Sequence, residues 1–164
     1  MQKSALSLRG DVLVRGFNAQ YVRTFQDSLS ARKARQGLIY EDKGRNLIVN
    51  NGSNLIAQLC TGSSTAYFTY CAVGSGTNAV TAGDSTLQTE LGRVAVIAAY
   101  AVSNMAHFDT FFSIGQGNGT WNETGIFNAS SNGTMGSRKL LSSSFSKSGA
   151  NTATVSWSWT FTPQ

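Results

Sequence analysis

The chain has 164 residues, which suits one domain with a hydrophobic core, and only 13% of the residues are charged. Its 17 glycines, single proline and frequent Ser, Thr and Asn favour many strands joined by tight turns and argue against a helical bundle. No apolar run approaches the roughly 20 residues that span a bilayer, and the first residues lack the apolar core of a secretory signal. We therefore expect a β-rich protein without a membrane partner.

Positive charge is concentrated near the N-terminus. Residues 1–46 hold nine Lys or Arg and four acidic residues, whereas the rest of the chain holds four of each sign. This asymmetry predicts a basic N-terminal arm with strand-like segments over residues 1–45 and a neutral body over residues 46–164. A basic segment suits an acidic patch on a protein neighbour, nucleic acid or an anionic surface. The candidate interface residues of the arm are Arg9, Arg15, Arg23, Arg32, Lys33 and Arg35.

Short apolar runs separated by turn residues predict the elements of the first half. Residues 6–25 indicate one or two strands, because their apolar side chains lie in short, partly alternating runs. Residues 28–36 predict either a short basic helix or a mobile loop. Further along, we expect a strand at 38–40, a turn at 41–44, a strand ending at Asn51-Gly52, a brief helix capped by Ser53, and a strand at 67–73.

The second half predicts a longer series of strands. Residues 74–83 form a turn-rich loop, and Asp84 is expected to cap one or two helical turns over 84–91. The connections that follow are short and favour antiparallel pairing. The fold class is thus all-β: an antiparallel, jelly-roll-like β-sandwich of about eight strands with one or two short helices. The strands of this half are expected at 94–102, 107–114, 120–127, 138–145 and 153–161.

The last of these strands has the clearest pattern. From Ala153 to Phe161, apolar and hydroxyl side chains alternate, which places Trp157 and Trp159 on one face. Burial of that face is worth about 6–12 kcal/mol, at roughly 1.5–3 kcal/mol for each large apolar side chain. We interpret both tryptophans as core residues in preference to a platform for stacking sugars or bases.

No motif supports an enzyme, a bound cofactor or a metal site. Gly74–Ala79 fits G-x-G-x-x-A, but no long helix begins after it, so its glycines indicate a turn. His107 and Asp109 share one face of a predicted strand, yet no nucleophile elbow accompanies them. The two cysteines, Cys60 and Cys71, match neither a redox pair nor a zinc-finger set, so we expect reduced, structural thiols.

The body contains a set of motifs in a fixed order. They are N-L-hydrophobic-x-N-x-G, then A-V-G-x-G-T followed by D-x-x-L-x-x-E, and finally N-E-x-G-hydrophobic-F. As a set they resemble a family of small bacteriophage structural proteins of tail, baseplate and tail-fibre attachment regions. The resemblance covers roughly the last two-thirds of the chain. Its residues are 45–57, 71–77, 84–87, 90–93, 120–128, 133–135 and Arg138.

The resemblance implies a non-enzymatic virion protein that assembles with copies of itself and with other virion structural proteins in the tail, baseplate or fibre-attachment region. One alternative is a capsid decoration or cement protein on the head shell. A second alternative is a receptor- or glycan-binding module that stacks sugars on exposed aromatic rings such as Trp121 or Tyr100. Nucleic-acid binding is less favoured, because the aromatic residues of the basic segment, such as Phe17 and Tyr21, follow a strand-like spacing that suits packing.

Overall fold

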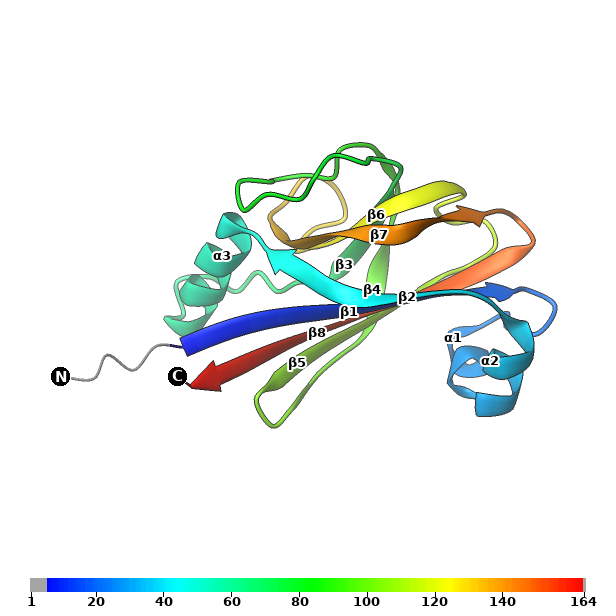
Figure 1. Ribbon diagram of the computed structural model, residues 1–164. Coiled ribbons are helices and arrows are strands. Elements are labelled where there is room, and N and C mark those ends of the chain that lie inside the picture. The colour runs from blue at the N-terminus through cyan, green and yellow to red at the C-terminus, as the bar shows by residue number, and fades with distance from the viewer. Residues whose placement is uncertain (1–5, 164) are drawn as a thin grey trace.

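The protein is a closed barrel of antiparallel strands in the computed structural model, which describes residues 6–163 (Figure 1). Its strands are β1 Leu6–Asn18, β2 Leu38–Ile48, β3 Tyr70–Gly74, β4 Glu90–Val102, β5 Met105–Phe112, β6 Gly119–Phe127, β7 Met135–Lys147 and β8 Asn151–Pro163. The described helices are α1 Phe25–Leu29, α2 Ala31–Gly37 and α3 Asn50–Cys60. Around the barrel the strands follow the order β1-β2-β7-β6-β3-β4-β5-β8.

The predicted all-β, antiparallel class with a few short helices is confirmed, but the predicted sandwich is wrong. Two strands, β2 and β4, change pairing partner along their length. Each therefore connects two groups of strands that would form separate sheets in a sandwich. In β4, residues 90–95 pair with β3 and residues 96–102 pair with β5. In β2, residues 38–46 pair with β1, whereas Leu47 and Ile48 pair with β7. The sheet therefore has continuous pairing through both corners and closes on itself.

The first and last strands lie side by side in the barrel wall. β1 pairs with β8 along its whole length, from Leu6 opposite Pro163 to Asn18 opposite Asn151. Val12 and Val14 of β1 are buried in the same core cluster as the apolar face of β8. The boundary expected between an arm and a body at residue 45 falls inside β2, and residues 6–18 and 38–48 are barrel strands. Apolar side chains on the inner face tie this segment into the barrel, and most of its charged side chains are exposed, with Asp42 of β2 as a buried exception.

Aromatic side chains fill the barrel. Trp157 and Trp159 are buried, as predicted, and Trp159 meets the ring of Phe68 edge-on at 4.9 Å between centroids. The Trp121 ring packs against Phe112 and Phe145 at 4.9 and 5.4 Å. Such edge-to-face pairs add to the stability that burial of their area provides. Of the two free cysteines, Cys71 lies in this core and Cys60 is exposed.

Several local predictions differ from the structure. The turn expected at 41–44 is part of β2, because cross-strand pairing with β1 continues through it. The helical turns expected over 84–91 are absent from the described structure, where Asp84 instead accepts hydrogen bonds from Thr81 and pairs with Arg138. The helix expected at Ser53 is longer and begins at Asn50.

Candidate functional site

A small helical projection connects β1 to β2 at one end of the barrel (Figure 1). We call residues 19–37 the basic lobe. Its first helix, α1, begins with a capping box: Thr24 Oγ1 accepts the Asp27 N–H at 3.1 Å, and the Asp27 carboxylate accepts the Thr24 N–H. Ser30 Oγ caps α2 through the Lys33 N–H. Helices this short are stable only when packed, and buried Val22 anchors the lobe by accepting a 2.6 Å hydrogen bond from Thr152 of β8.

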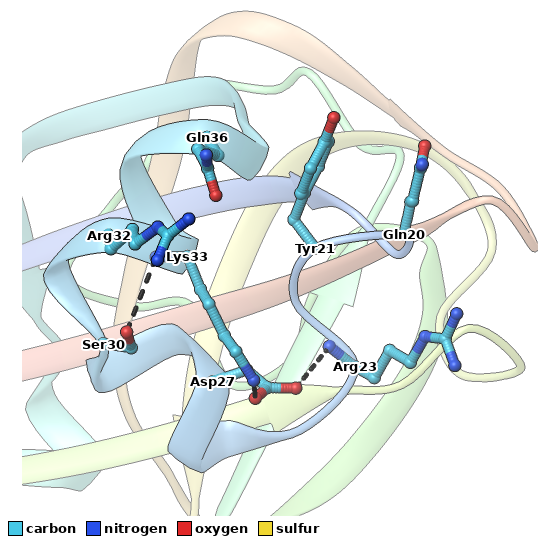
Figure 2. A pocket seen from close by; sticks show the side chains of 8 residues that line it. All are labelled: Gln20, Tyr21, Arg23, Asp27, Ser30, Arg32, Lys33 and Gln36. Atoms are coloured by element: carbon cyan, nitrogen blue, oxygen red, sulfur yellow. Dashed lines mark hydrogen bonds and ion pairs between the residues drawn. The ribbon is translucent and has the colours of Figure 1, made fainter.

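The basic lobe surrounds an open hollow of about 630 Å³ (Figure 2). Arg23, Arg32 and Lys33 line it, together with Gln20, Tyr21 and Gln36. Asp27 is the acid of the hollow: its carboxylate pairs with Lys33 and accepts the Arg23 N–H, and these contacts lower the pKa of Asp27 to about 2. The carboxylate thus stays ionised and neutralises Lys33. No acidic partner of Arg23 or Arg32 is found among the described residues, so the hollow carries excess positive charge.

The six basic residues predicted as an interface fall into two groups. Arg23, Arg32, Lys33 and Arg35 belong to the basic lobe, where Arg35 is exposed in the last turn of α2. The other two side chains lie on β1 and have acidic partners: Arg9 pairs with Asp11 at 3.0 Å, and Arg15 pairs with Glu41 of β2 at 2.7 Å. Within the described residues, unneutralised positive charge therefore remains on Arg23, Arg32 and Arg35 of the first group, whereas Lys33 pairs with Asp27.

Apolar side chains stand exposed beside this charge, and the sequence analysis missed them. Leu29, at the end of α1, is 62% exposed, and Ile39, at the start of β2, is 53% exposed. Leu38 and Tyr21 are also exposed. The strand predicted at 38–40 is the start of β2, where Leu38 pairs with Phe17 and Tyr40 with Gly16 of β1, and Ile39 lies without a register partner at the shift between them. The basic lobe is consequently both cationic and apolar, a combination typical of protein interfaces.

The second and third motif stretches of the body meet in one largely buried ionic network. The Glu123 carboxylate accepts the backbone N–H groups of Gly76, Gln88 and Thr89 at 2.9–3.1 Å. Arg138 bridges Glu123 at 2.8 Å and Asp84 at 2.7 Å. These bonds hold the loop between β3 and β4 against β6 and β7. The acids of the motifs thus have structural partners, and the G-x-G-x-x-A turn receives a carboxylate where a nucleotide-binding loop would receive a phosphate.

The remaining candidates from the sequence occupy different environments. Trp121 is fully buried, so it offers no platform for a sugar and that part of the glycan-binding alternative is wrong. Tyr100 is half exposed on β4, and its ring stacks on His107 at 5.0 Å between centroids. His107 lies opposite Ser158 on the outer face of the barrel. The aromatic pair is thus a surface feature of the β4–β5 hairpin.

No group of three or more His, Cys, Asp or Glu suited to a metal ion occurs within residues 6–163. None of the helices in that range combines the length and apolarity required to cross a bilayer. Comparison of the chain with protein-family models, with curated proteins and with solved structures finds no match. The resemblance to bacteriophage structural proteins accordingly stays a prediction.

Proposed function

We propose that the protein is a non-enzymatic structural subunit of a bacteriophage virion, placed in the tail, baseplate or fibre-attachment region. In this proposal the basic lobe contacts an acidic patch on a neighbouring virion protein. The observation that carries the proposal is the composition of this projection from the barrel end: the lobe holds Arg32, Arg35 and exposed Leu29, and exposed Ile39 follows it at the start of β2. Arginine with apolar neighbours is the composition favoured in protein–protein contacts.

The buried network supports a structural role for the motif residues. Asp84, Glu123 and Arg138 belong to the stretches that carry the family resemblance, and the structure joins them in one set of bonds. A carboxylate that accepts three backbone N–H groups and an arginine is committed to holding a loop in place. The motifs therefore specify a rigid barrel, which suits a protein that acts through its outer surfaces.

The apolar component of the lobe favours a protein partner over nucleic acid. Phosphate backbones select for clustered Lys and Arg, and bound bases add stacking on exposed aromatic rings. In the lobe, Asp27 neutralises Lys33, and the most exposed large apolar side chain is aliphatic Leu29 at 62%, against 39% for the aromatic Tyr21. An acidic protein surface with apolar residues complements both the positive charge and the exposed apolar side chains of the lobe.

The test compares charge reversal inside and outside the lobe. We expect Arg32→Glu with Arg35→Glu to abolish incorporation into particles, because both side chains would then repel the acidic patch. Lys43→Glu with Arg45→Glu is the matched control, since both of these residues are exposed on β2 outside the lobe. Quantitative mass spectrometry of purified particles measures incorporation. Absence of the wild-type chain from particles, or equal incorporation of both variants, would refute the proposal.

Electron micrographs of particles with the subunit labelled distinguish the position. Label on the tail supports the proposal as stated. Label on the head shell supports the capsid decoration alternative instead.

A further inference from the structure

The outer half of β4 is an edge strand with an open side. Residues 96–102 pair with β5, whereas pairing with β3 ends at Ala95. The last backbone hydrogen bond on the β3 side of this strand, within the described residues, is the one from Val96 N–H to Thr69 O at 2.8 Å. Beyond it, the β4–β5 hairpin extends past the neighbouring elements (Figure 1).

Alternation along the hairpin shows which groups face the open side. Val102 and Met105 are register partners on either side of the two-residue turn Ser103-Asn104. In such a hairpin, the two residues next to the turn form backbone hydrogen bonds with each other. Hydrogen-bonded and non-hydrogen-bonded pairs alternate along an antiparallel ladder. Tyr100 therefore directs its backbone N–H and C=O groups toward β5, while Ala99 and Ala101 direct theirs away from it. Both alanines are exposed, so their outward N–H and C=O groups lack cover.

This edge lacks the charged protection that proteins usually place on exposed strands. Residues 94–106 contain no Lys, Arg, Asp, Glu or Pro. Its large side chains are apolar or aromatic and exposed: Ile97 by 52%, Tyr100 by 49% and Val102 by 51%. A bulge near Ile97 bends the strand, yet Ala98 to Val102 keep a regular register. An open, uncharged and apolar edge of this kind is a template for the addition of another strand.

We propose that β4 binds β4 of a second copy of this chain, in antiparallel pairing about a two-fold axis at Tyr100. Ala99 of one copy then faces Ala101 of the other, and their outward N–H and C=O groups bond across the axis. The two Tyr100 rings lie opposite each other as a cross-strand aromatic pair. This inference goes beyond the proposed function, which concerns the basic lobe and a different protein.

Charge and position favour a second copy as the occupant. Each chain carries a net charge of +5, so two copies meet most readily through a segment without charge, and identical neutral strands are self-complementary. The β4–β5 turn lies at the barrel end that holds Thr160 and Pro163, whereas the basic lobe follows Asn18 at the opposite end. Pairing through β4 thus leaves the lobe free for its own partner. A contact of one short strand is smaller than a standard interface, so we expect a weak, concentration-dependent dimer.

The test measures association of the full chain in solution. Sedimentation velocity over a wide range of protein concentration should show the mass rising from one chain to two. Ala101→Lys should abolish the rise, because the two lysines would lie diagonally across the axis on the same face of the paired strands and repel each other. Ala79→Lys is the matched control: it adds the same charge at an exposed alanine in a distant loop, and it should still dimerise. Circular dichroism confirms that both variants keep the wild-type fold.

Amide hydrogen exchange of the wild-type chain provides a readout that requires no variant. The Ala99 and Ala101 amides should exchange more slowly as protein concentration rises, because pairing covers them. A monomer at all concentrations, unchanged exchange at these amides, or a dimer that survives Ala101→Lys would overturn the proposal. A heterologous strand on β4 would appear as protection only when a second protein is added, which also overturns it. None of these outcomes affects the lobe, whose role is tested by incorporation into particles.

Discussion

Glu123 of β6 and Arg138 of β7 form an ion pair at 2.8 Å inside the protein, where Glu123 is fully buried and Arg138 is 3% exposed. Taking two charges out of water is costly, and hydrogen bonds to the remaining polar atoms must offset that cost. Glu123 receives three backbone N–H groups, and Arg138 donates further to Asp84 and to the Asn78 carbonyl. The pair is therefore the centre of a network that fixes the conformation of the β3–β4 loop.

Removal of the Glu123 carboxylate should destabilise the protein strongly. Glu123→Ala leaves Arg138 without one of its two acids and three N–H groups without their acceptor, so we expect a loss of about 3–5 kcal/mol in the free energy of unfolding. Urea denaturation measures the loss. Glu90→Ala is the control. Glu90 is partly exposed where it pairs with Arg93, so its removal should lower the free energy of unfolding by no more than about 1 kcal/mol. Similar losses in both variants would contradict the structural role of Glu123.

A second ionic contact joins β2 and β7, two strands whose backbone pairing involves only Leu47 and Ile48 of β2 within the described residues. Asp42 of β2 is buried; it pairs with Lys139 and accepts the Ser142 N–H from β7. Burial alone would raise the pKa of Asp42, but the hydrogen bonds from Lys139 and Ser142 outweigh it and hold the pKa below its ordinary value of 3.8. The ionised carboxylate therefore stabilises the folded state above about pH 3.8, and this contribution is lost as pH falls through the lower, folded-state pKa.

Asp42→Asn should remove that acid dependence. At neutral pH we expect a loss of roughly 1.5–3 kcal/mol, the contribution typical of hydrogen bonds to a charged group, because Lys139 loses its ionic partner. Below pH 3.8 the variant and the wild-type chain should converge. Urea denaturation over a series of pH values tests this, with Asp11→Asn at the exposed Arg9–Asp11 pair as the control. A constant difference between wild type and Asp42→Asn across that range would contradict the assignment.

How far the sequence predicts the fold depends on whether local patterns carry the information. The alternation from Ala153 to Phe161 gave β8 and its buried face, because a period of two residues belongs to one strand alone. Closure of the barrel depends instead on long-range pairing, such as β1 with β8, which no local pattern encodes. Trp121 illustrates the same limit: its neighbours Thr120 and Asn122 are polar, and its burial results from packing on Phe112 and Phe145.

The candidate site shows the same division. Charge asymmetry identified the basic residues of the lobe, since net charge is a property of composition. Whether a given charge stays free depends on cross-strand neighbours, and register placed Glu41 opposite Arg15. The exposure of Ile39 at the register shift between β1 and β2, and the open side of β4 beyond its pairing with β3, both depend on long-range strand pairing. These features need the three-dimensional arrangement.

Gly52 offers a test of packing against intrinsic propensity. It lies in α3, where alanine is the better helix former by about 1 kcal/mol. A Cβ at this position, however, would lie 2.2 Å from the Gly136 carbonyl oxygen of β7. Since backbone atoms cannot move aside cheaply, Gly52→Ala should lower the free energy of unfolding by roughly 1–3 kcal/mol in spite of the helix preference.

Thermal and urea denaturation of Gly52→Ala measure this loss. Ser53→Ala, at the next and exposed position of α3, is the matched control and should be neutral or slightly stabilising. A Gly52→Ala variant at least as stable as the wild-type chain would show that α3 does not pack on β7 as closely as described.

Lys147 should make the protein more stable as the solution becomes alkaline. The side chain is 3% exposed, and its Nζ donates to two neutral acceptors, the Ser113 carbonyl at 2.7 Å and Asn118 Oδ1 at 3.0 Å. Burial lowers the pKa of Lys147 from 10.5 to about 8. Between these values the unfolded chain binds the proton that the folded chain has released, so the free energy of unfolding rises with pH across this window, by about 1–3 kcal/mol.

Urea denaturation of the wild-type chain and of Lys147→Met from about pH 7.5 to about pH 10 measures this rise. The difference between their free energies of unfolding at each pH cancels the contribution of other titrating groups. Methionine retains the length of the side chain and removes the charge, so the variant should lack the rise. Lys43→Met, at an exposed position of β2, should keep it. If the curves of wild type and Lys147→Met ran parallel, burial of the charged ammonium would cost nothing measurable, and the hydrogen bonds to Ser113 and Asn118 would be strong enough to replace its hydration.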